Sequence, residues 1–565
     1  MSSVAARAPR VLVIGLDGAT LTWLRPLAEQ GRLPTLARLM REGGHGPLAS
    51  IIPAHTGAAW PSMITGRNPG KHGLFDFERM DVANYACLDG FATSETLVGR
   101  TIFDVASASG QRVAALRVPM TYPTWPINGV MASGYPAPPR TDRYAYPATL
   151  ASLLPPVAFK IHGRTPDITL ANLQREIVTL TSAACQLLAA DRYDLCMLVY
   201  QQPDQAHHLF WRYADPASPL YTDEAAAAYG DLIAQCYISV DNAIARLLEY
   251  TSDDTLILVV SDHGAERAPA TYFQTNSWLR ELGLLAPAAE PVLHARARNR
   301  FDLRHVVPKD LRRAARRWLL GSGNERLRST VGRLSQGTTA LDWGRTSAYW
   351  FPVHQQMEGI AINLRGRQPR GIVEPGAEYE ALRERLIGEL RALRQPGSQD
   401  ALVVEVHRRE EAFSGPYTER APDVLYRLAP GYQSHNDLNG SLFTRVPAHA
   451  LERHSAWHDR AGIVVAHGPG IAPGAALEDA RLLDIAPTVL TALGLPCPAE
   501  CDGHALPAIV GAGSHPHEQP ETAADASPDR GASASAERAP QPAAVSLSDE
   551  EEENIRNRLQ ALGYL

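Results

Sequence analysis

Short runs of continuous apolar residues recur along the chain, and each is followed by a polar or glycine-containing segment. These runs are rich in β-branched residues and lie at 11–16, 113–118, 195–200, 256–260 and 463–466. A strand with one wet face would alternate apolar and polar residues, so continuous runs indicate strands buried on both faces. Helix-like segments follow the runs. We therefore predict an α/β protein with a mostly parallel central sheet covered by helices.

The pattern changes between residues 271 and 430. Arginines crowd the stretch 296–333, and a strand-like GIAINL and a helix-like EYEALRERLIGELRAL follow it. We predict an inserted, cap-like α+β subdomain over 271–430, beside a catalytic core made of residues 1–270 and 431–510. The arginine-rich stretch could steer an anionic substrate, touch an anionic membrane surface, or form a solvated helical face over apolar neighbours.

The C-terminal part of the chain divides into a linker and a helix. Residues 511–546 are rich in Ala, Pro, Ser and Glu and poor in large apolar residues, which predicts a flexible linker. Residues 547–565 predict a helix with Ser548 as N-cap and an apolar stripe of Ile555, Leu559 and Leu562. This helix is expected to dock either on its own core or on a partner.

Composition narrows the class of protein. The 565 residues are 45% hydrophobic and 20% charged, as in an ordinary soluble enzyme, and the net charge of −7 gives no reason to expect duplex nucleic acid as a partner. The first apolar run is too short for a signal peptide core or a membrane span, so cytoplasmic residence is expected. No C-x-x-C pair occurs, which argues against a thiolate zinc site or a disulfide framework among Cys87, Cys185, Cys196, Cys236, Cys497 and Cys501.

Several ionisable side chains stand directly after the predicted strands. Asp17 follows the first run, Asp204 follows the third, and the pair Asp262 and His263 follows the fourth. In open α/β sheets, functional groups gather beyond the carboxyl ends of the strands. Asp204 and His208 are four residues apart, so one face of a helical turn would present both to a single metal ion. The adjacent His207 is the less favoured choice.

Two further segments complete the candidate site. The segment PAHTGAAWPSMITG places the hydroxyl of Thr56 where a helix can open, and free backbone N–H groups at a helix N-terminus favour a phosphate. The segment SAWHDRAG precedes the last apolar run and offers His458 as a metal ligand. His454 and His467 are interpreted as surface or hydrogen-bonded histidines.

The full set of motifs resembles the alkaline phosphatase superfamily, in its type I phosphodiesterase/nucleotide pyrophosphatase branch. The nearest likeness is to the group described as predicted phosphohydrolase/mutases. The order of the motifs carries the resemblance: GLDG, T-x8-TG-x2-P-x2-HG, PD-x3-H, SDHG, W-H-x3-G, DIAPTVLTALGLP-x5-DG and RLQALGYL. The resemblance implies a three-layer sandwich around the central sheet, with the inserted subdomain at its side.

The resemblance also implies the role of each site residue. In the similar pyrophosphatases the nucleophile is the threonine nine residues before the TG pair, which here is Thr56. Two divalent ions are implied, Zn²⁺ in the first place and Mn²⁺ as an alternative. One ion would be held by Asp204, His208 and His458, and the other by Asp17, Asp262, His263 and Thr56.

Such a site would hydrolyse a small-molecule phosphate ester, as a phosphodiesterase or nucleotide pyrophosphatase, with a phosphomonoesterase as the alternative. Two ions about 3.5 to 4 Å apart can clamp the attacking and leaving oxygens of an in-line displacement. Attack by Thr56 and then by water predicts a phospho-threonine intermediate and retention at phosphorus. The same machinery could pass the group to another acceptor, as a transferase or mutase. The complete set of seven ligands argues against a non-catalytic scaffold.

The chain departs from related patterns at two places. The similar pyrophosphatases have a phosphate-binding asparagine a few residues after the HG pair, and Phe77 occupies that position here, after Asp76. A nucleotide substrate is therefore not implied. Sulfatases of the superfamily need Cys or Ser in a C/S-x-P-x-R context, which the sequence after Thr56 lacks, so a sulfatase is disfavoured.

Overall fold

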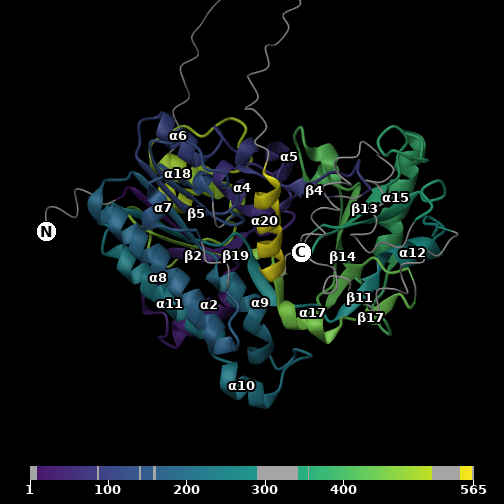
Figure 1. Cartoon of the computed structure of the whole chain (residues 1–565), viewed down its shortest axis with the longest axis horizontal. Helices are drawn as coiled ribbons and strands as arrows, with labels where there is room; N and C mark the ends of the chain where they lie inside the picture. The colour runs from purple at the N-terminus through teal and green to yellow at the C-terminus, as the bar shows by residue number, and fades with distance from the viewer. Residues whose placement is uncertain are drawn as a thin grey trace, which may run out of the picture.

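The computed structural model of the chain describes residues 9–85, 88–138, 141–156, 161–288, 341–353, 356–438, 440–511 and 547–562. Its largest sheet has nine strands in the order β20-β2-β19-β9-β1-β8-β5-β6-β7. Figure 1 labels β2, β19 and β5 of this sheet. In that order they span Ala475–Ala476, Gly44–Ala49, Ala461–His467, Leu256–Val260, Val11–Leu16, Leu195–Tyr200, Val113–Val118, Gly129–Ser133 and Ala145–Tyr146.

The five predicted apolar runs are five adjacent strands of this sheet, in the order β19-β9-β1-β8-β5. Strands β9, β1, β8 and β5 run parallel to one another, which confirms a mostly parallel sheet. Strand β19 runs antiparallel to β9, although its hydrophobic pattern is the same. Continuous hydrophobicity reports burial on both faces and carries no information about strand direction.

The two faces of the sheet are covered by separate helical layers. Alternate strand residues point to opposite faces, so Leu12 and Ile14 join one apolar cluster while Val11 and Val13 join the other. The first cluster includes helices α2, α3, α8, α9 and α11, at Leu21–Glu29, Pro34–Glu42, Pro166–Ala190, Gln202–Ala214 and Leu232–Leu248. The second includes α4, α6 and α18, at Thr56–Thr65, Ile102–Ala108 and Ile485–Ala492. The predicted three-layer sandwich is confirmed.

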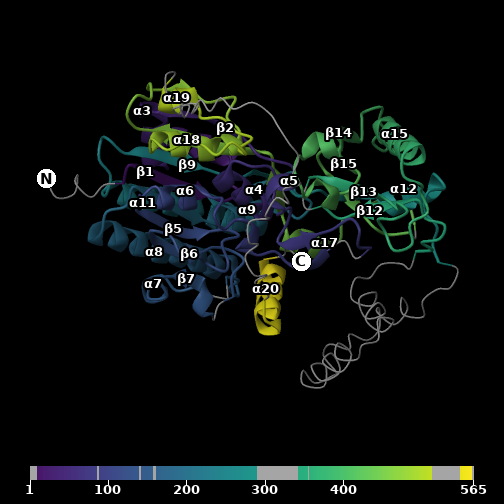
Figure 2. The same ribbon diagram turned by 90° about the horizontal axis from the view of Figure 1, so that it is seen from above.

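A second lobe lies beside the sandwich (Figures 1 and 2). Its four-stranded sheet has the order β12-β13-β15-β14, with strands at Ala348–Phe351, Glu358–Ile362, Val424–Leu428 and Val403–Arg408. Helix α12 (Thr275–Glu281) and helix α15 (Ala377–Ala392) pack on it around an apolar cluster of their own. The strand and helix predicted in the insertion are thus β13 and α15.

The chain joins the two lobes through small sheets and loops. A three-stranded sheet, β16-β11-β17, combines Tyr432–His435, Thr271–Gln274 and Phe443–Arg445. A two-stranded ribbon then pairs β10 (Gly264–Arg267) with β18 (Ala456–Asp459) and leads back to the large sheet. The domain limits proposed from the sequence stay a prediction. The arginine-rich stretch 296–333 lies outside the described residues.

The C-terminal helix docks on its own core. Helix α20 spans Asp549–Leu562 and lies near the junction of the two lobes in both overall views (Figures 1 and 2). The Glu551 carboxylate accepts hydrogen bonds from Arg143 at 2.6 Å and from the Tyr122 hydroxyl. Ile555 and Leu559 are buried in the apolar cluster that contains α4. The helix therefore uses an intramolecular site, while the linker proposed before it falls outside the described residues.

Shortening the apolar stripe of α20 is expected to loosen this docking. Leu559 is fully buried, so Leu559→Ala should weaken the attachment of α20 by about 2–5 kcal/mol. Amide hydrogen exchange over 549–562 should accelerate in this variant and stay unchanged in the exposed control Asn557→Ala. Equal exchange in both variants would contradict the docking shown here.

Two absences concern the described residues alone. Among them, no helix is long and apolar enough to cross a membrane. The five cysteines in the described ranges are free thiols, so no disulfide links those parts of the chain. Cytoplasmic residence stays a prediction.

Candidate active site

Three neighbouring strands deliver the acidic residues to one edge of the large sheet. Asp17 directly follows β1, and Asp262 follows β9 after one intervening serine, with β9 lying beside β1. Asp204 lies in the first turn of α9, just after β8 on the other side of β1. All three carboxylates are buried, with at most 2% exposure. Parallel pairing therefore explains why residues far apart in sequence meet here.

Helix α9 and strand β18 form one compact group of possible metal ligands. The Asp204 Oδ1 atom lies 3.1 Å from His208 Nε2 and 3.5 Å from His458 Nε2. The two imidazole Nε2 atoms are 3.2 Å apart. One ligand atom from each of the three residues falls within 4.8 Å of the others. The predicted one-turn spacing of Asp204 and His208 on a helix is what the structure contains.

The second group surrounds the Thr56 hydroxyl. Thr56 Oγ1 lies 3.2 Å from Asp17 Oδ1 and 3.2 Å from His263 Nε2. Asp262 Oδ2 lies 3.3 Å from the same His263 nitrogen. The compact three-residue group on this side combines Asp17 and His263 with Asp204, so Asp204 stands between the two groups. The structure thus brings all seven predicted site residues together.

Each of the three histidines presents Nε2 to the site. A carbonyl oxygen can only accept a hydrogen bond, so an Nδ1 atom that contacts a carbonyl carries the ring proton. In the neutral ring Nε2 then offers a lone pair, which is the arrangement of metal-bound histidines. The carbonyl partners, each at 2.9 Å, are Ala456 for His208, Gly264 for His263 and Ala54 for His458.

The chemistry of these atoms fits divalent cations. Imidazole nitrogens and carboxylate oxygens converge at 3.1–3.5 Å, and this mixed set suits Zn²⁺. Within the described residues, the buried Asp262 Oδ2 atom has no hydrogen-bond donor, while its other oxygen accepts the Gly18 N–H. Buried anionic oxygens are costly without a positive charge, and a bound cation would supply it.

Burial and mutual repulsion govern the charge of the acidic residues. Burial raises the pKa of Asp17 well above its ordinary value, and the charges of Asp262 and Asp204 raise it further. Burial also raises the pKa of Asp262 to about 6, against the lowering effect of His263. Burial alone would raise the pKa of Asp204, but His208 holds it well below the usual range. The protein without metal therefore retains protons that a cation would displace.

Metal-dependent stabilisation is accordingly expected to grow with pH. The raised pKa of Asp262 means that the folded, metal-free protein binds this proton more tightly than the unfolded chain, whose value is near 3.8. The tighter binding of this proton adds to the free energy of unfolding at pH values below the unfolded pKa of about 3.8. This contribution is lost as the pH rises through the folded pKa of about 6. The increase in melting temperature on adding Zn²⁺ should thus be larger at about pH 7.5 than at about pH 5. An increment that is the same at both pH values would contradict this linkage.

Helix α4 places Thr56 at its first position. The preceding His55 is its N-cap, and the His55 Nδ1 atom accepts the N–H of Gly57 at 3.2 Å. One of the first-turn N–H groups expected to be free for phosphate is therefore already bonded. A Cβ atom on Gly57 would lie 2.7 Å from the Phe77 nitrogen, so glycine allows the backbone at Phe77 to approach the helix start.

The less favoured histidines lie elsewhere. His207 packs among Trp23, Trp211 and Tyr237, and burial lowers its pKa to about 3. The His454 Nδ1 atom lies 3.4 Å from the His208 Nδ1 atom. His454 therefore contacts His208 at the ring nitrogen that is not presented to the site. His467 pairs with Ile257 on the sheet, away from the strand ends that carry the ligands.

Trp60 is not among the residues predicted for the site, although its spacing from Thr56 contains a signal. Residues four apart on a helix share a face, so a helix that begins at Thr56 presents Trp60 on the same side. The Trp60 indole N–H donates to Asp17 Oδ2 at 3.1 Å. Phe77, at the position of the missing asparagine, packs edge-on against His55 with ring centroids 4.7 Å apart, and its phenyl side chain cannot donate a hydrogen bond to a phosphoryl oxygen.

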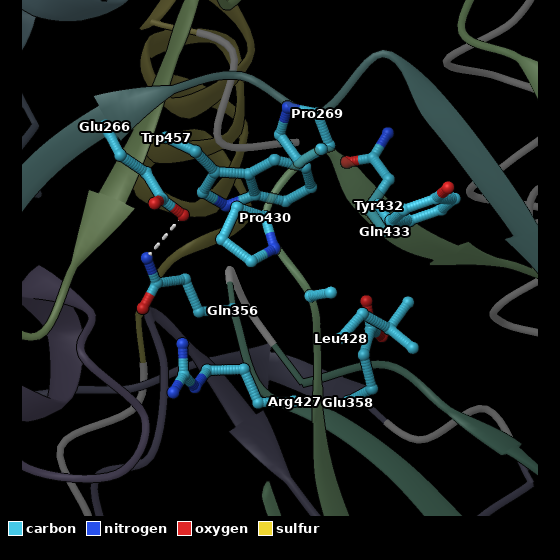
Figure 3. A pocket seen from close by; sticks show the side chains of 12 residues that line it. Glu266, Pro269, Gln356, Glu358, Arg427, Leu428, Pro430, Tyr432, Gln433 and Trp457 are labelled. Carbon is cyan, nitrogen blue, oxygen red and sulfur yellow. Dashed lines mark hydrogen bonds between the residues drawn. The ribbon is translucent and has the colours of Figure 1, made fainter. Parts of the chain in front are cut away.

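A separate small pocket lies against the β10–β18 ribbon (Figure 3). Glu266 of β10 accepts a hydrogen bond from Gln356 of the second lobe at 2.8 Å, and burial raises the Glu266 pKa to about 7. Trp457 also lines this pocket. Neighbouring strand residues point to opposite faces, so this pocket and the adjacent His458 side chain lie on different sides of the ribbon.

A buried hydroxyl at a helix start, facing converging carboxylates and imidazoles, suits a metal-dependent hydrolase. Comparison with protein families agrees. The model of the type I phosphodiesterase/nucleotide pyrophosphatase family matches residues 11–342, more than half of the chain. The chain belongs to this family, and it is a metal-dependent phosphoric ester hydrolase.

Two solved structures are similar to this chain. Phosphonoacetate hydrolase from Sinorhizobium meliloti 1021, in complex with phosphonoformate, is 16% identical, with a TM-score of 0.51 over 86% of this chain and 96% of that chain. Human ectonucleotide pyrophosphatase/phosphodiesterase 5 is 14% identical, with a TM-score of 0.44 over 87% and 96%. The likeness to the hydrolase shows a shared fold. A comparison with curated protein sequences gives no match.

Proposed function

We propose that the protein is a two-metal phosphodiesterase of small phosphate esters that works through a phospho-threonine intermediate on Thr56. The observation that carries the proposal is the position of Thr56 Oγ1, 3.2 Å from both Asp17 Oδ1 and His263 Nε2 at the start of α4. A free alcohol is a weak nucleophile near neutral pH and needs such activation.

The proposed ligand sets follow the two groups of side chains. Asp17, Asp262 and His263 would hold one ion beside the Thr56 hydroxyl. The other would be held by Asp204, His208 and His458. When bound, the ions lower the pKa of the attacking hydroxyl and neutralise the leaving oxygen. We propose Zn²⁺ as the natural metal because the sets mix imidazole and carboxylate, with Mn²⁺ as the alternative.

The protein residues then act in two displacements. Thr56 Oγ1 forms a bond to phosphorus while the ester oxygen of the leaving group departs. Water next attacks the same phosphorus from the side opposite Oγ1. The Oγ1–phosphorus bond then breaks, and phosphate or a phosphate monoester is released. Two inversions give net retention of configuration. The backbone at the start of α4 favours the phosphoryl group through the helix dipole.

The side chain of Phe77, beside the start of α4, bears on the substrate class. Phe77 occupies the position where the similar pyrophosphatases have an asparagine, so that side-chain hydrogen bond to a phosphoryl oxygen is absent here. We propose a small ester without a requirement for a nucleoside. The acidic net charge of −7 gives duplex nucleic acid no favourable surface.

An assay with two generic esters tests the proposal. Purified enzyme stripped with a chelator should cleave neither bis(p-nitrophenyl) phosphate nor p-nitrophenyl phosphate, and added Zn²⁺ or Mn²⁺ should restore cleavage of the diester. Added alcohols would show whether the phosphoryl group passes to an acceptor other than water, as in a transferase or mutase. Cleavage of neither ester, together with no bound metal by elemental analysis, would overturn the proposal in favour of a scaffold.

A further inference from the structure

Helix α4 holds both oxygens of one carboxylate. Thr56 and Trp60 are one helical turn apart, and both contact Asp17 at the end of β1. The Thr56 hydroxyl lies 3.2 Å from Oδ1, and the Trp60 Nε1–H donates to Oδ2 at 3.1 Å. The same helix thus carries the proposed nucleophile and a clamp on the acidic residue beside it.

The Trp60 indole is tightly packed and has little room to change its orientation. Trp60 is fully buried, and its ring lies against the backbone of β1. A Cβ atom on Gly15 would approach the Trp60 Cη2 atom to 2.4 Å, so only glycine at this position leaves room for the ring. Val199 of the neighbouring strand would approach the same Cβ to 2.8 Å and closes the space from the other side. The direction of the indole N–H is therefore set by packing.

The carboxylates of Asp17 and Asp262 have the same arrangement of contacts. In Asp17, Oδ2 takes the Trp60 N–H, and Oδ1 lies 3.5 Å from His263 Nε2. In Asp262, Oδ1 takes the N–H of Gly18, and Oδ2 lies 3.3 Å from the same His263 nitrogen. Each carboxylate thus has one oxygen held by a neutral donor while the other faces His263.

We propose that Trp60 is a positioning residue that orients Asp17 as a ligand through one oxygen and so sets metal affinity on the Thr56 side of the site. This inference rests on the proposed function, because it assumes that a cation binds between Asp17 and His263. Removing a hydrogen-bond donor that orients a metal ligand typically lowers metal affinity or activity by about 10–100-fold. Unlike the Gly18 backbone N–H, the indole donor can be removed by mutation.

The alternative is that Trp60 only fills the core. The chain offers a matched control for this alternative in Trp125, which is also buried and belongs to the same apolar cluster. The Trp125 Nε1–H donates to Asp104 Oδ1 at 2.8 Å. Asp104 belongs to a capping box at the start of α6 and not to the metal-ligand groups. Trp125→Phe therefore removes an indole–carboxylate hydrogen bond without touching the site.

The experiment compares wild-type enzyme, Trp60→Phe and Trp125→Phe by competition titration of Zn²⁺ with a chelating indicator, which resolves two dissociation constants. In Trp60→Phe, one constant should rise about 10–100-fold while the other changes less than about 3-fold. Trp125→Phe should leave both constants within about 3-fold of wild type while lowering the melting temperature. With Co²⁺ in place of Zn²⁺, the visible spectrum should change in Trp60→Phe alone.

A second variant covers the possibility that Trp60→Phe does not fold. Gly15→Ala alters no ligand but displaces the indole, and it should weaken the same metal constant. Wild-type constants in a folded Trp60→Phe or Gly15→Ala protein would overturn the inference and leave the proposed function standing. Wild-type enzyme that binds no divalent ion would overturn the proposed function, and the inference with it.

Discussion

Thr56→Ala is expected to lower kcat for the diester by roughly 10⁴- to 10⁶-fold while the protein still folds and still binds metal through its remaining side chains. The variant removes the Oγ1 atom, which is the protein atom proposed to bond to phosphorus. Asp17, Asp262 and His263 stay in place on that side of the site. Stopped-flow assays of the nitrophenyl diester, with metal content measured on the same samples, test the expectation.

Two control variants separate chemistry from structure. Thr65→Ala alters a threonine of the same helix whose hydroxyl bonds the Pro61 carbonyl at 2.7 Å, and it should stay within about 10-fold of wild type. Thr56→Ser keeps a hydroxyl and should retain part of the activity. Near-native turnover in Thr56→Ala would show that the nucleophile is another group, or that water attacks directly.

The second large effect concerns two adjacent histidines with different surroundings. His208→Asn should lose metal from the Asp204 side of the site and lower kcat/KM at least about 100-fold, because the imidazole Nε2 atom is removed. His207→Asn should keep both ions, because His207 packs among aromatic residues away from the ligand groups. Its expected cost is about 1–3 kcal/mol of folding stability.

Elemental analysis and thermal unfolding of the two variants give the readout. Loss of one equivalent of metal in His208→Asn alone would support the assignment. The reverse pattern, with metal lost in His207→Asn and kept in His208→Asn, would show that the two histidines exchange roles when a cation binds.

Much of the sheet could be predicted from the sequence because the central strands are short buried runs, and several of them end close to an acidic residue. Val11–Leu16 and Leu256–Val260 are strands with the predicted limits. The meeting of Asp17 with Asp262 follows once those strands are parallel neighbours, because their carboxyl ends then share an edge. The prediction needed only local hydrophobicity and one rule of sheet geometry.

Other features depend on contacts that no local pattern encodes. The direction of β19 is set by its pairing with β2 and β9, and its apolar sequence is compatible with either direction. His55 was missed as an N-cap because histidine is not among the residues that usually cap helices. Trp60 was read as part of a motif, and its hydrogen bond to Asp17 depends on how closely α4 approaches β1.

The place of β19 in the sheet has a consequence for biosynthesis. Strand β9 pairs with β1 on one side and with β19 on the other, and β19 begins only at Ala461. A growing chain that has passed Val260 therefore carries an open, strongly apolar strand edge for about 200 residues of translation, roughly 10–40 s at ordinary rates of synthesis. Such an edge is a template for intermolecular pairing. Expression at low temperature or with chaperones that shield nascent chains should raise the yield of this enzyme more than changes to its surface charge.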